Sequence, residues 1–329
     1  MLKLAQKLAL VQSIRQFKVL ELPLYKESEL FSVNVTIGPP PQPHSMWVDT
    51  GSSSTWIKAS RFDMSSSATA RTVSDEGLDL TYFNHAHVTG DIIRDDFGIG
   101  SAVVHNMTIG LAEIVDSTAH ILTSGILALA PMDYRPNDIS QGGLLEKLVE
   151  QGAINTRTVA LWLDHGREKP SMIIGGYDKT KYMGNLTVFP MRPTPGFSVT
   201  WRFCGVNVSS MALTTPDGSS KSVVSPEFNS YFMMDSGGAD SYFPSSVVET
   251  LVAMLQPYGL IKGSRRGSYM APCDIVDQPG GLDLGFLGGR GDGKGPRYRI
   301  HFRGLFGDIE EVGPDRMVET KIGACEGSE

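Results

Sequence analysis

Two short acidic motifs hold the residues of this chain that could do chemistry together. Asp49-Thr50-Gly51 follows the apolar pair Trp47-Val48, and Asp235-Ser236-Gly237 follows Met233-Met234. At average composition, two Asp-(Thr or Ser)-Gly triplets arise by chance in roughly one chain of this length in a hundred. Two carboxyls held close together cannot both ionise cheaply, so they share a proton, and one acts as base while the other acts as acid. Asp49 and Asp235 are therefore predicted to activate a water molecule for hydrolysis, without a metal or a covalent intermediate.

Strands must end at both motifs if the carboxylates are to be held in place. Residues 31–37 alternate apolar and polar side chains, the period of a half-buried strand, and the apolar residues 46–48 lead directly into Asp49. Loops held by sheets are common places for chemistry. Further strands are expected at residues 91–93, 103–109, 160–163, 172–174, 186–189, 231–234 and 298–302.

Few helices are expected, and the two clearest lie in different halves of the chain. The clearest covers residues 247–257, with Ser246 as N-cap, Glu249 completing a capping box and Gly259 beyond its end. A shorter helix is expected at residues 144–151, ended by Gly152. The two aspartates lie 186 residues apart, which indicates a distant internal duplication in which each half supplies one carboxylate.

The composition fits two β-rich domains. A chain of 329 residues exceeds the usual size of one hydrophobic core, and 36 Gly and 19 Pro favour many turns. The net charge of −7 argues against nucleic acid or an anionic membrane as the main partner.

No apolar run approaches the roughly 18 residues needed to cross a bilayer. Residues 1–15 make a poor signal peptide, and a propeptide remnant, a docking helix and a misplaced gene start all stay open for them.

The chain resembles the pepsin-like aspartic endopeptidases (peptidase family A1) from about Lys18 to Cys325. Besides the two Asp motifs, the resemblance rests on Gly38-Pro39-Pro40-Pro41-Gln42, Gly125-Ile126-Leu127, Ile173-Ile174-Gly175-Gly176-Tyr177-Asp178 and Pro272-Cys273-Asp274. It implies an all-β, bilobal, pepsin-like double-psi β-barrel fold with a few short helices. The implied domains are an N-terminal segment (1–17), an N-terminal lobe with Asp49 and a flap (18–189), and a C-terminal lobe with Asp235 (190–329).

The resemblance also implies roles for the residues around the dyad. Thr50 and Ser236 would clamp the two loops together, Ser52 would support Asp49, and Gly51 and Gly237 would let backbone amides approach the carboxylates. Tyr82 resembles the tyrosine of the family's flap, a hairpin that covers bound peptide and excludes water, and Trp56 resembles its partner. An ordinary cross-strand aromatic is the alternative for Tyr82. Substrate would contact Gly51, Tyr82 and Gly237, and no cofactor or metal is implied.

Cysteines and glycosylation motifs favour an oxidising compartment. The resemblance implies a disulfide between Cys273 and Cys325, which leaves Cys204 over, and three reduced thiols are the alternative. N-glycosylation motifs lie at Asn34, Asn106, Asn185 and Asn207. We therefore expect a protein that is secreted or lies in the vacuole and secretory pathway, and that is a monomer.

Three features depart from the family's pattern. Ala128 stands where the family usually has a glycine beside the first catalytic loop. Gly238 replaces a residue whose hydroxyl normally bonds the second carboxylate. The chain stops at Glu329, before the Ile-Leu-Gly-Asp segment and terminal strands with which the family continues, so the second lobe is expected to be incomplete.

The leading hypothesis is an endopeptidase that cuts extended polypeptides between bulky apolar residues at acidic pH. A catalytically silent pepsin-like protein that binds peptides or other partners is the alternative, favoured by the three departures. A hydrolase acting on sugars is a weaker hypothesis, because both carboxylates lie in Asp-(Thr/Ser)-Gly turns.

Two further motifs are weak signals. His85 and His87 could share a metal but have no evident third ligand. The glycine-rich residues 288–295 lack the Ser or Thr of a phosphate-binding loop.

Overall fold

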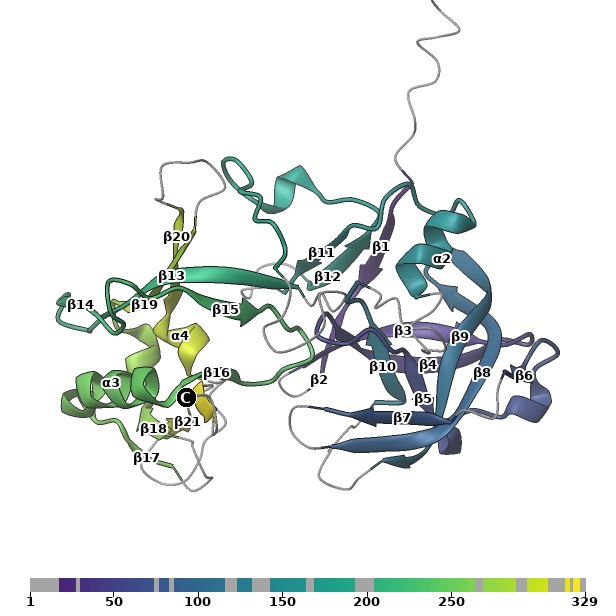
Figure 1. Cartoon of the computed structure of the whole chain (residues 1–329), viewed down its shortest axis with the longest axis horizontal. Coiled ribbons are helices and arrows are strands. Elements are labelled where there is room, and N and C mark those ends of the chain that lie inside the picture. The colour runs from purple at the N-terminus through teal and green to yellow at the C-terminus, as the bar shows by residue number, and fades with distance from the viewer. Residues whose placement is uncertain are drawn as a thin grey trace, which may run out of the picture. The chain divides into compact units, whose positions relative to one another are not determined.

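The computed structural model divides the chain into two units, Met1–Gly184 and Asn185–Glu329, each with its own hydrophobic core (Figure 1). It describes residues 18–27, 30–73, 77–82, 86–115, 123–131, 143–163, 169–192, 204–263, 269–287, 295–306, 317–319 and 322–325. The domain boundary expected after Phe189 stays a prediction. Among these residues no helix is long and apolar enough to cross a membrane.

A nine-stranded sheet dominates the first unit. Its strand order is β2-β3-β4-β10-β5-β9-β8-β6, and β7 pairs with β8. The strands are β2 (Tyr25–Glu27), β3 (Leu30–Ile37), β4 (Gln42–Asp49), β5 (Trp56–Lys58), β6 (Arg71–Thr72), β7 (Leu78–Thr81), β8 (His87–Ile99), β9 (Ala102–Val115) and β10 (Gly125–Ala128). A further pairing of β3 with β8 closes part of the sheet into a barrel. Strand β4 lies between β3 and β10, and at its end Asp49 pairs with Ala128 of β10.

A small sheet, one helix and short turns make up the other described elements of the first unit. The sheet has the order β1 (Leu20–Pro23), β12 (Ser171–Ile174), β11 (Val159–Trp162). The 3-10 turns are η1 (Ala59–Arg61), η2 (Met64–Ser66) and η3 (Lys179–Lys181). Helix α2 (Leu144–Glu150) buries three leucines. Gly152 follows it with a φ of +70°, a conformation that favours glycine and stops the helix.

Alternation of buried and exposed side chains builds the core of the first unit. On β3, Val33, Val35 and Ile37 are buried while Asn34 is exposed, as the period of a strand requires. These apolar side chains join one large cluster. A second cluster forms around the fully buried Trp56 and includes Leu78 of β7 and residues of β8, so it lies beneath the β7–β8 hairpin.

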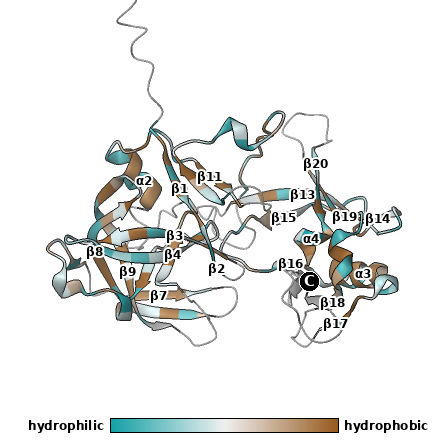
Figure 2. Cartoon of the chain, turned by 180° about the vertical axis from the view of Figure 1, so that it is seen from behind, coloured by the Kyte–Doolittle hydropathy of each residue, from teal (hydrophilic) through white to brown (hydrophobic). Residues whose placement is uncertain are grey.

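The described residues of the second unit form three sheets and two helices. The largest sheet has the order β14-β13-β19-β20, with β15 also paired to β13; the others are β16-β22 and β17-β18-β21. The strands are β13 (Gly205–Thr214), β14 (Ser220–Ser222), β15 (Ser230–Met233), β16 (Ser241–Pro244), β17 (Ile261–Lys262), β18 (Tyr269–Pro272), β19 (Gly281–Phe286), β20 (Arg297–His301), β21 (Met317–Glu319) and β22 (Ile322–Cys325). The helices are α3 (Ser245–Leu255) and α4 (Phe302–Leu305), with 3-10 turns η4 (Gln256–Tyr258) and η5 (Cys273–Asp277). Hydrophobic stretches, brown in Figure 2, lie on α2 and α3, and α3 buries Val247, Val248, Leu251 and Leu255 in the second core.

The expected β-rich fold with few short helices is confirmed, but two details are wrong. Residues 186–189 form no regular element, because apolar alternation makes a strand only where a neighbouring strand pairs with it. The expected helix at residues 247–257 begins instead at Ser245, with Pro244 as N-cap and no side-chain cap bond. The predicted Ser246 cap and its capping box with Glu249 are therefore absent, since Ser246 already lies inside the helix.

Candidate active site

The carboxylate of Asp49 is buried and fixed at both oxygens. Asp49 is the last residue of β4 and is 5% exposed. The backbone N–H of Gly51 donates to Asp49 Oδ1 at 2.7 Å, and the hydroxyl of Ser52 donates to Asp49 Oδ2 at 2.5 Å. Burying a carboxylate without hydrogen-bond donors would destabilise the fold. These two bonds therefore allow the Asp49 carboxylate to be buried and fix its orientation.

Strand β10 supports the Asp49 loop from below. It pairs in parallel with β4, with Ala128 opposite Asp49. The N–H of Leu129 donates to the carbonyl of Asp49 at 2.7 Å, and the N–H of Ala128 donates to Thr55 Oγ1 at 3.1 Å. Ala128 is thus accommodated here as a buried residue whose N–H is hydrogen-bonded.

Thr55 was not singled out from the sequence, although its hydroxyl ties β10 to the loop. The residue is buried. It closes the run Ser52-Ser53-Ser54-Thr55, and this row of hydroxyls directly after the Asp motif is the signal that could have found it.

Tyr82 lies at the turn end of the β7–β8 hairpin, directly after β7, and is bonded to Trp56 of β5. Trp56 Nε1 donates to the Tyr82 hydroxyl at 2.6 Å, and the N–H of Tyr82 donates to the carbonyl of Ala86 at 2.9 Å across the hairpin. Burial raises the pKa of Tyr82; the bond from Trp56 lowers it and the nearby Asp49 charge raises it further. The phenol therefore stays protonated near Asp49 throughout the acidic range. Residues 83–85, with the predicted His85, lie outside the described residues.

The Asp235 loop of the second unit repeats part of the Asp49 geometry. It follows β15, which pairs with β13 so that Met233 lies opposite Gly205. The N–H of Gly237 donates to Asp235 Oδ1 at 2.8 Å, the counterpart of the bond from Gly51 to Asp49. A Cβ added at Gly238 would lie 3.5 Å from Asp235 Oδ2, so Gly238 occupies the place from which Ser52 reaches the first carboxylate. Asp235 is half-buried, whereas Asp49 is buried.

Asp49 and Asp235 belong to different units, and their meeting in a dyad stays a prediction. The clamp between Thr50 and Ser236 stays a prediction for the same reason. Within its own unit, each motif shows a carboxylate held by the N–H two residues ahead.

Residues 31–289, most of the chain, match the family model of the eukaryotic aspartyl proteases. The chain belongs to this family. Among curated relatives, the probable aspartic-type endopeptidase opsB of Aspergillus oryzae is 27% identical over 79% of this chain and 56% of its own length. Secreted aspartic protease 6 of Candida albicans is 26% identical over 74% of this chain and 58% of its own length. The chain thus spans little more than half the length of these relatives.

The crystal structure of an aspartic proteinase from Irpex lacteus is similar in fold to this aspartyl protease chain. It aligns with a TM-score of 0.74 over 94% of this chain and 88% of that structure, at 20% sequence identity. Together with the strand content, the match confirms the pepsin-like fold that the sequence predicts.

The predicted disulfide between Cys273 and Cys325 stays a prediction. Cys273 forms no disulfide among the described residues, and the side chain of Cys325 lies outside them.

The remaining predicted positions differ in their surroundings. Asn34, Asn106 and Asn185 are exposed, whereas the side-chain amide of Asn207 donates to Asn229 Oδ1 at 2.9 Å. His87 Nε2 lies 2.8 Å from Asp79 Oδ1 across the hairpin. No group of three metal-ligating side chains occurs in the part of the chain that the structure describes. Residues 288–294 of the glycine-rich stretch lie outside the described residues.

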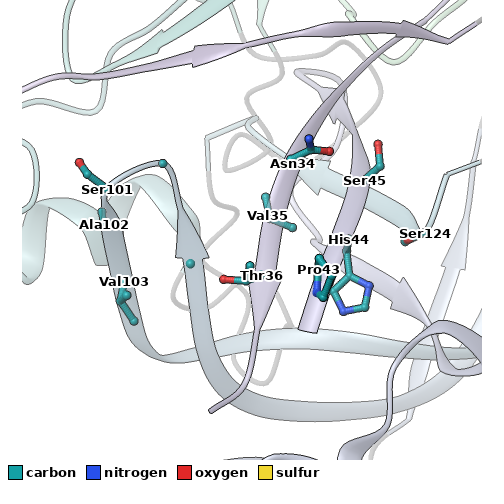
Figure 3. A pocket seen from close by; sticks show the side chains of 12 residues that line it. Asn34, Val35, Thr36, Pro43, His44, Ser45, Ser101, Ala102, Val103 and Ser124 are labelled. Atoms are coloured by element: carbon teal, nitrogen blue, oxygen red, sulfur yellow. The ribbon is translucent and has the colours of Figure 1, made fainter. Parts of the chain in front are cut away.

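A pocket of about 600 Å³ in the first unit is separate from the candidate site. It is lined by residues of β3, β4 and the β8–β9 turn, among them Asn34, His44 and Ser101. In Figure 3, Asn34 and Ser45 lie on neighbouring strands, with Ser101 across from them. Neither Asp49 nor Asp235 lines it, whereas Asn34 of the first glycosylation motif does.

Proposed function

We propose that this chain is an aspartic-type endopeptidase in which Asp49 and Asp235 activate a water molecule for attack on a peptide carbonyl. The observation that carries the proposal is the shared geometry of the two Asp loops. In each, the N–H two residues ahead donates to Oδ1, at 2.7 Å for Asp49 and 2.8 Å for Asp235. Such matched loops in two units of one family fold are what a shared-proton dyad requires.

The ionised member of the pair takes a proton from the water, which attacks the carbonyl carbon, while the protonated member donates its proton to the carbonyl oxygen. Thr50 and Ser236 hold the loops together in this proposal, and Ser52 orients Asp49. Gly51, Gly237 and Tyr82 contact the bound peptide, with Trp56 fixing the phenol of Tyr82.

The proposed substrate is an extended polypeptide with bulky apolar residues, cut at acidic pH and bound as a strand. A secreted or secretory-pathway location is supported by relatives named as secreted aspartic proteases and by the exposed glycosylation motifs. A monomer is the simplest assembly for a fold that supplies both carboxylates from one chain.

A silent peptide-binding protein is the second candidate, and Gly238 favours it. Without a hydroxyl at this position, Asp235 keeps the bond from the Gly237 N–H but lacks a counterpart to the bond from the Ser52 hydroxyl to Asp49. A carboxylate that is less well oriented would bind substrate but transfer protons poorly.

Cleavage of denatured haemoglobin or a quenched peptide library between pH 3 and pH 7, with and without pepstatin, tests the proposal. Asp49→Ala and Asp235→Ala should each lose at least about a thousandfold in kcat. Asp91→Ala, an exposed aspartate on β8, should cut like the wild type. Folded wild-type protein that cuts nothing would favour the silent binder.

A further inference from the structure

The pocket of the first unit has an uncharged, polar lining. Its volume is about 600 Å³, and sites for small molecules occupy about 300–1,000 Å³. Among the 12 residues that line it, none is an aspartate, glutamate, lysine or arginine. The ring of His44, the one titratable group among them, lies 6.2 Å from the ring of Phe62. The lining therefore offers no charge to pair with an ion, and it suits an uncharged polar ligand.

Three hydroxyls of this lining have no hydrogen-bond partner among the described residues. They belong to Thr36 on β3, Ser101 in the β8–β9 turn and Ser124 before β10. The hydroxyl of Ser45 is already used, because it donates to Glu27 Oε1 at 3.0 Å. A hydroxyl can both donate and accept a hydrogen bond. Free hydroxyls around one hollow are therefore suited to the hydroxyl and amide groups of a sugar.

Two glycines keep the pocket open between β3 and the β8–β9 turn. Strand β3 pairs with β8 from Val35 onward, with Thr36 opposite Gly98. A Cβ at Gly98 would overlap the Thr36 hydroxyl, so this glycine leaves the room that the Thr36 side chain occupies. Gly100 then turns the chain with a φ of +56°, a conformation that favours glycine. The pairing with β8 thus stops before Asn34, and that side of Asn34 stays open to the pocket.

Asn34 places an attachment point for a sugar in the lining of this pocket. It begins the glycosylation motif Asn34-Val35-Thr36, is exposed, and has no side-chain hydrogen bond among the described residues. It lies opposite Ser45 in the register of β3 and β4, and both line the pocket (Figure 3). Asn106, which begins another exposed motif of the first unit, lies outside this lining, and its side-chain oxygen accepts a bond from Arg71.

We propose that this pocket binds the first N-acetylglucosamine of a glycan linked to Asn34. In the transfer, the Asn34 amide nitrogen bonds to C1 of the sugar, the bond from C1 to its lipid diphosphate carrier breaks, and the diphosphate and one amide proton leave. Thr36, Ser101 and Ser124 then bind the polar groups of the sugar, and the exposed Val103 packs against its acetyl methyl group. Because the sugar is tethered, weak contacts are enough to hold it in the pocket.

The inference rests on the proposed passage through the secretory pathway and is independent of the peptidase activity. The full-length Asp49→Ala chain, used to prevent self-digestion, is secreted from a eukaryotic host behind an added signal peptide. Peptide N-glycosidase, which cuts between the asparagine and the first sugar, acts on the folded and on the heat-unfolded protein in heavy-oxygen water. Mass spectrometry then follows the conversion of each glycosylated asparagine to aspartate.

Two variants show whether the pocket is responsible for any protection. S101A/S124A removes two hydroxyls of the lining and keeps the glycosylation motif. S60A/S220A is the matched control, because Ser60 of η1 and Ser220 of β14 are exposed serines outside the pocket.

We expect the glycan at Asn34 to leave the folded protein about tenfold more slowly than the unfolded protein, because its linkage opens only when the sugar leaves the pocket. S101A/S124A should speed the release from the folded protein about fivefold, and S60A/S220A should not change it. A glycan at Asn106 should leave both forms at similar rates. Equal release at Asn34 from both forms, or protection that S101A/S124A does not reduce, would overturn the inference. Unmodified Asn34 beside another modified motif would overturn the inference alone; a chain without any glycan would overturn the proposed location as well.

Discussion

The hydroxyl of Ser52 lies 2.5 Å from Asp49 Oδ2, and the second Asp loop has no counterpart to this bond because glycine occupies position 238. The two loops otherwise hold their carboxylates alike, through the N–H of Gly51 and of Gly237. The difference makes the proposed dyad unequal. In this chain Asp49 is the more firmly oriented carboxylate.

Removing the Ser52 hydroxyl should impair catalysis more than folding. A hydrogen bond to a charged group contributes about 1.5–3 kcal/mol, so Ser52→Ala should lower kcat about tenfold to a hundredfold. Steady-state kinetics and thermal unfolding check this together. Ser53→Ala, one residue further on, is the control and should keep kcat; equal losses in both variants would contradict the role given to Ser52.

A hydroxyl added at position 238 should orient the Asp235 carboxylate more firmly and raise kcat. The 3.5 Å between an added Cβ at Gly238 and Asp235 Oδ2 is an ordinary contact, so Gly238→Ser fits without strain. One added bond contributes about 1 kcal/mol, or roughly fivefold in kcat. Because a donor favours the ionised form of a carboxyl, the acid limb of the pH–activity profile should also move to lower pH. Gly238→Ala, which adds no donor, should show neither effect.

Tyr82→Phe should destabilise the first unit. It removes the acceptor of Trp56 Nε1 in a fully buried side chain, and an unsatisfied buried donor costs about 1–3 kcal/mol. Urea unfolding followed by tryptophan fluorescence measures the loss. Tyr25→Phe, at an exposed tyrosine, should change the free energy of unfolding little, and a similar small effect from Tyr82→Phe would show that the bond contributes nothing.

His44 should make the first unit less stable in acid. The side chain is 6% exposed, its Nε2 has no partner among the described groups, and burial lowers its pKa from 6.5. The unfolded chain therefore binds the proton first, and stability is lost as the pH falls below about 6.5 towards the lowered value. His44→Leu should gain stability relative to the wild type at pH 4.5 compared with pH 7.5 in denaturant unfolding. A difference between the two proteins that does not change with pH would refute this.

Among the glycosylation motifs, Asn185 should carry a glycan and Asn207 should not. Asn185 is exposed and lies outside any helix or strand, whereas Asn207 lies within β13 and its amide nitrogen donates to Asn229 Oδ1. Peptide mass mapping after secretion from a eukaryotic host, before and after glycosidase treatment, determines occupancy. A glycan at Asn207 with none at Asn185 would contradict this prediction.

Local patterns in the sequence were enough to predict the strands that carry the Asp motifs and the helix at α2. Apolar alternation along β3 and the glycine after α2 act within a few residues, so their physical effect is visible in the sequence itself. The Asp-Thr-Gly and Asp-Ser-Gly motifs likewise predicted the chemistry, because residue type limits what a side chain can do.

Tertiary structure alone decided which distant segments serve these motifs. The pairing of β10 with β4 places Ala128 opposite Asp49, and the bond from Trp56 to Tyr82 joins residues on different strands. Residues 186–189 have the alternation of a strand, yet no strand among the described residues pairs with them. Burial and hydrogen bonding depend on partners far away in the sequence, so the same apolar pattern forms a core strand at β3 and no regular element at residues 186–189.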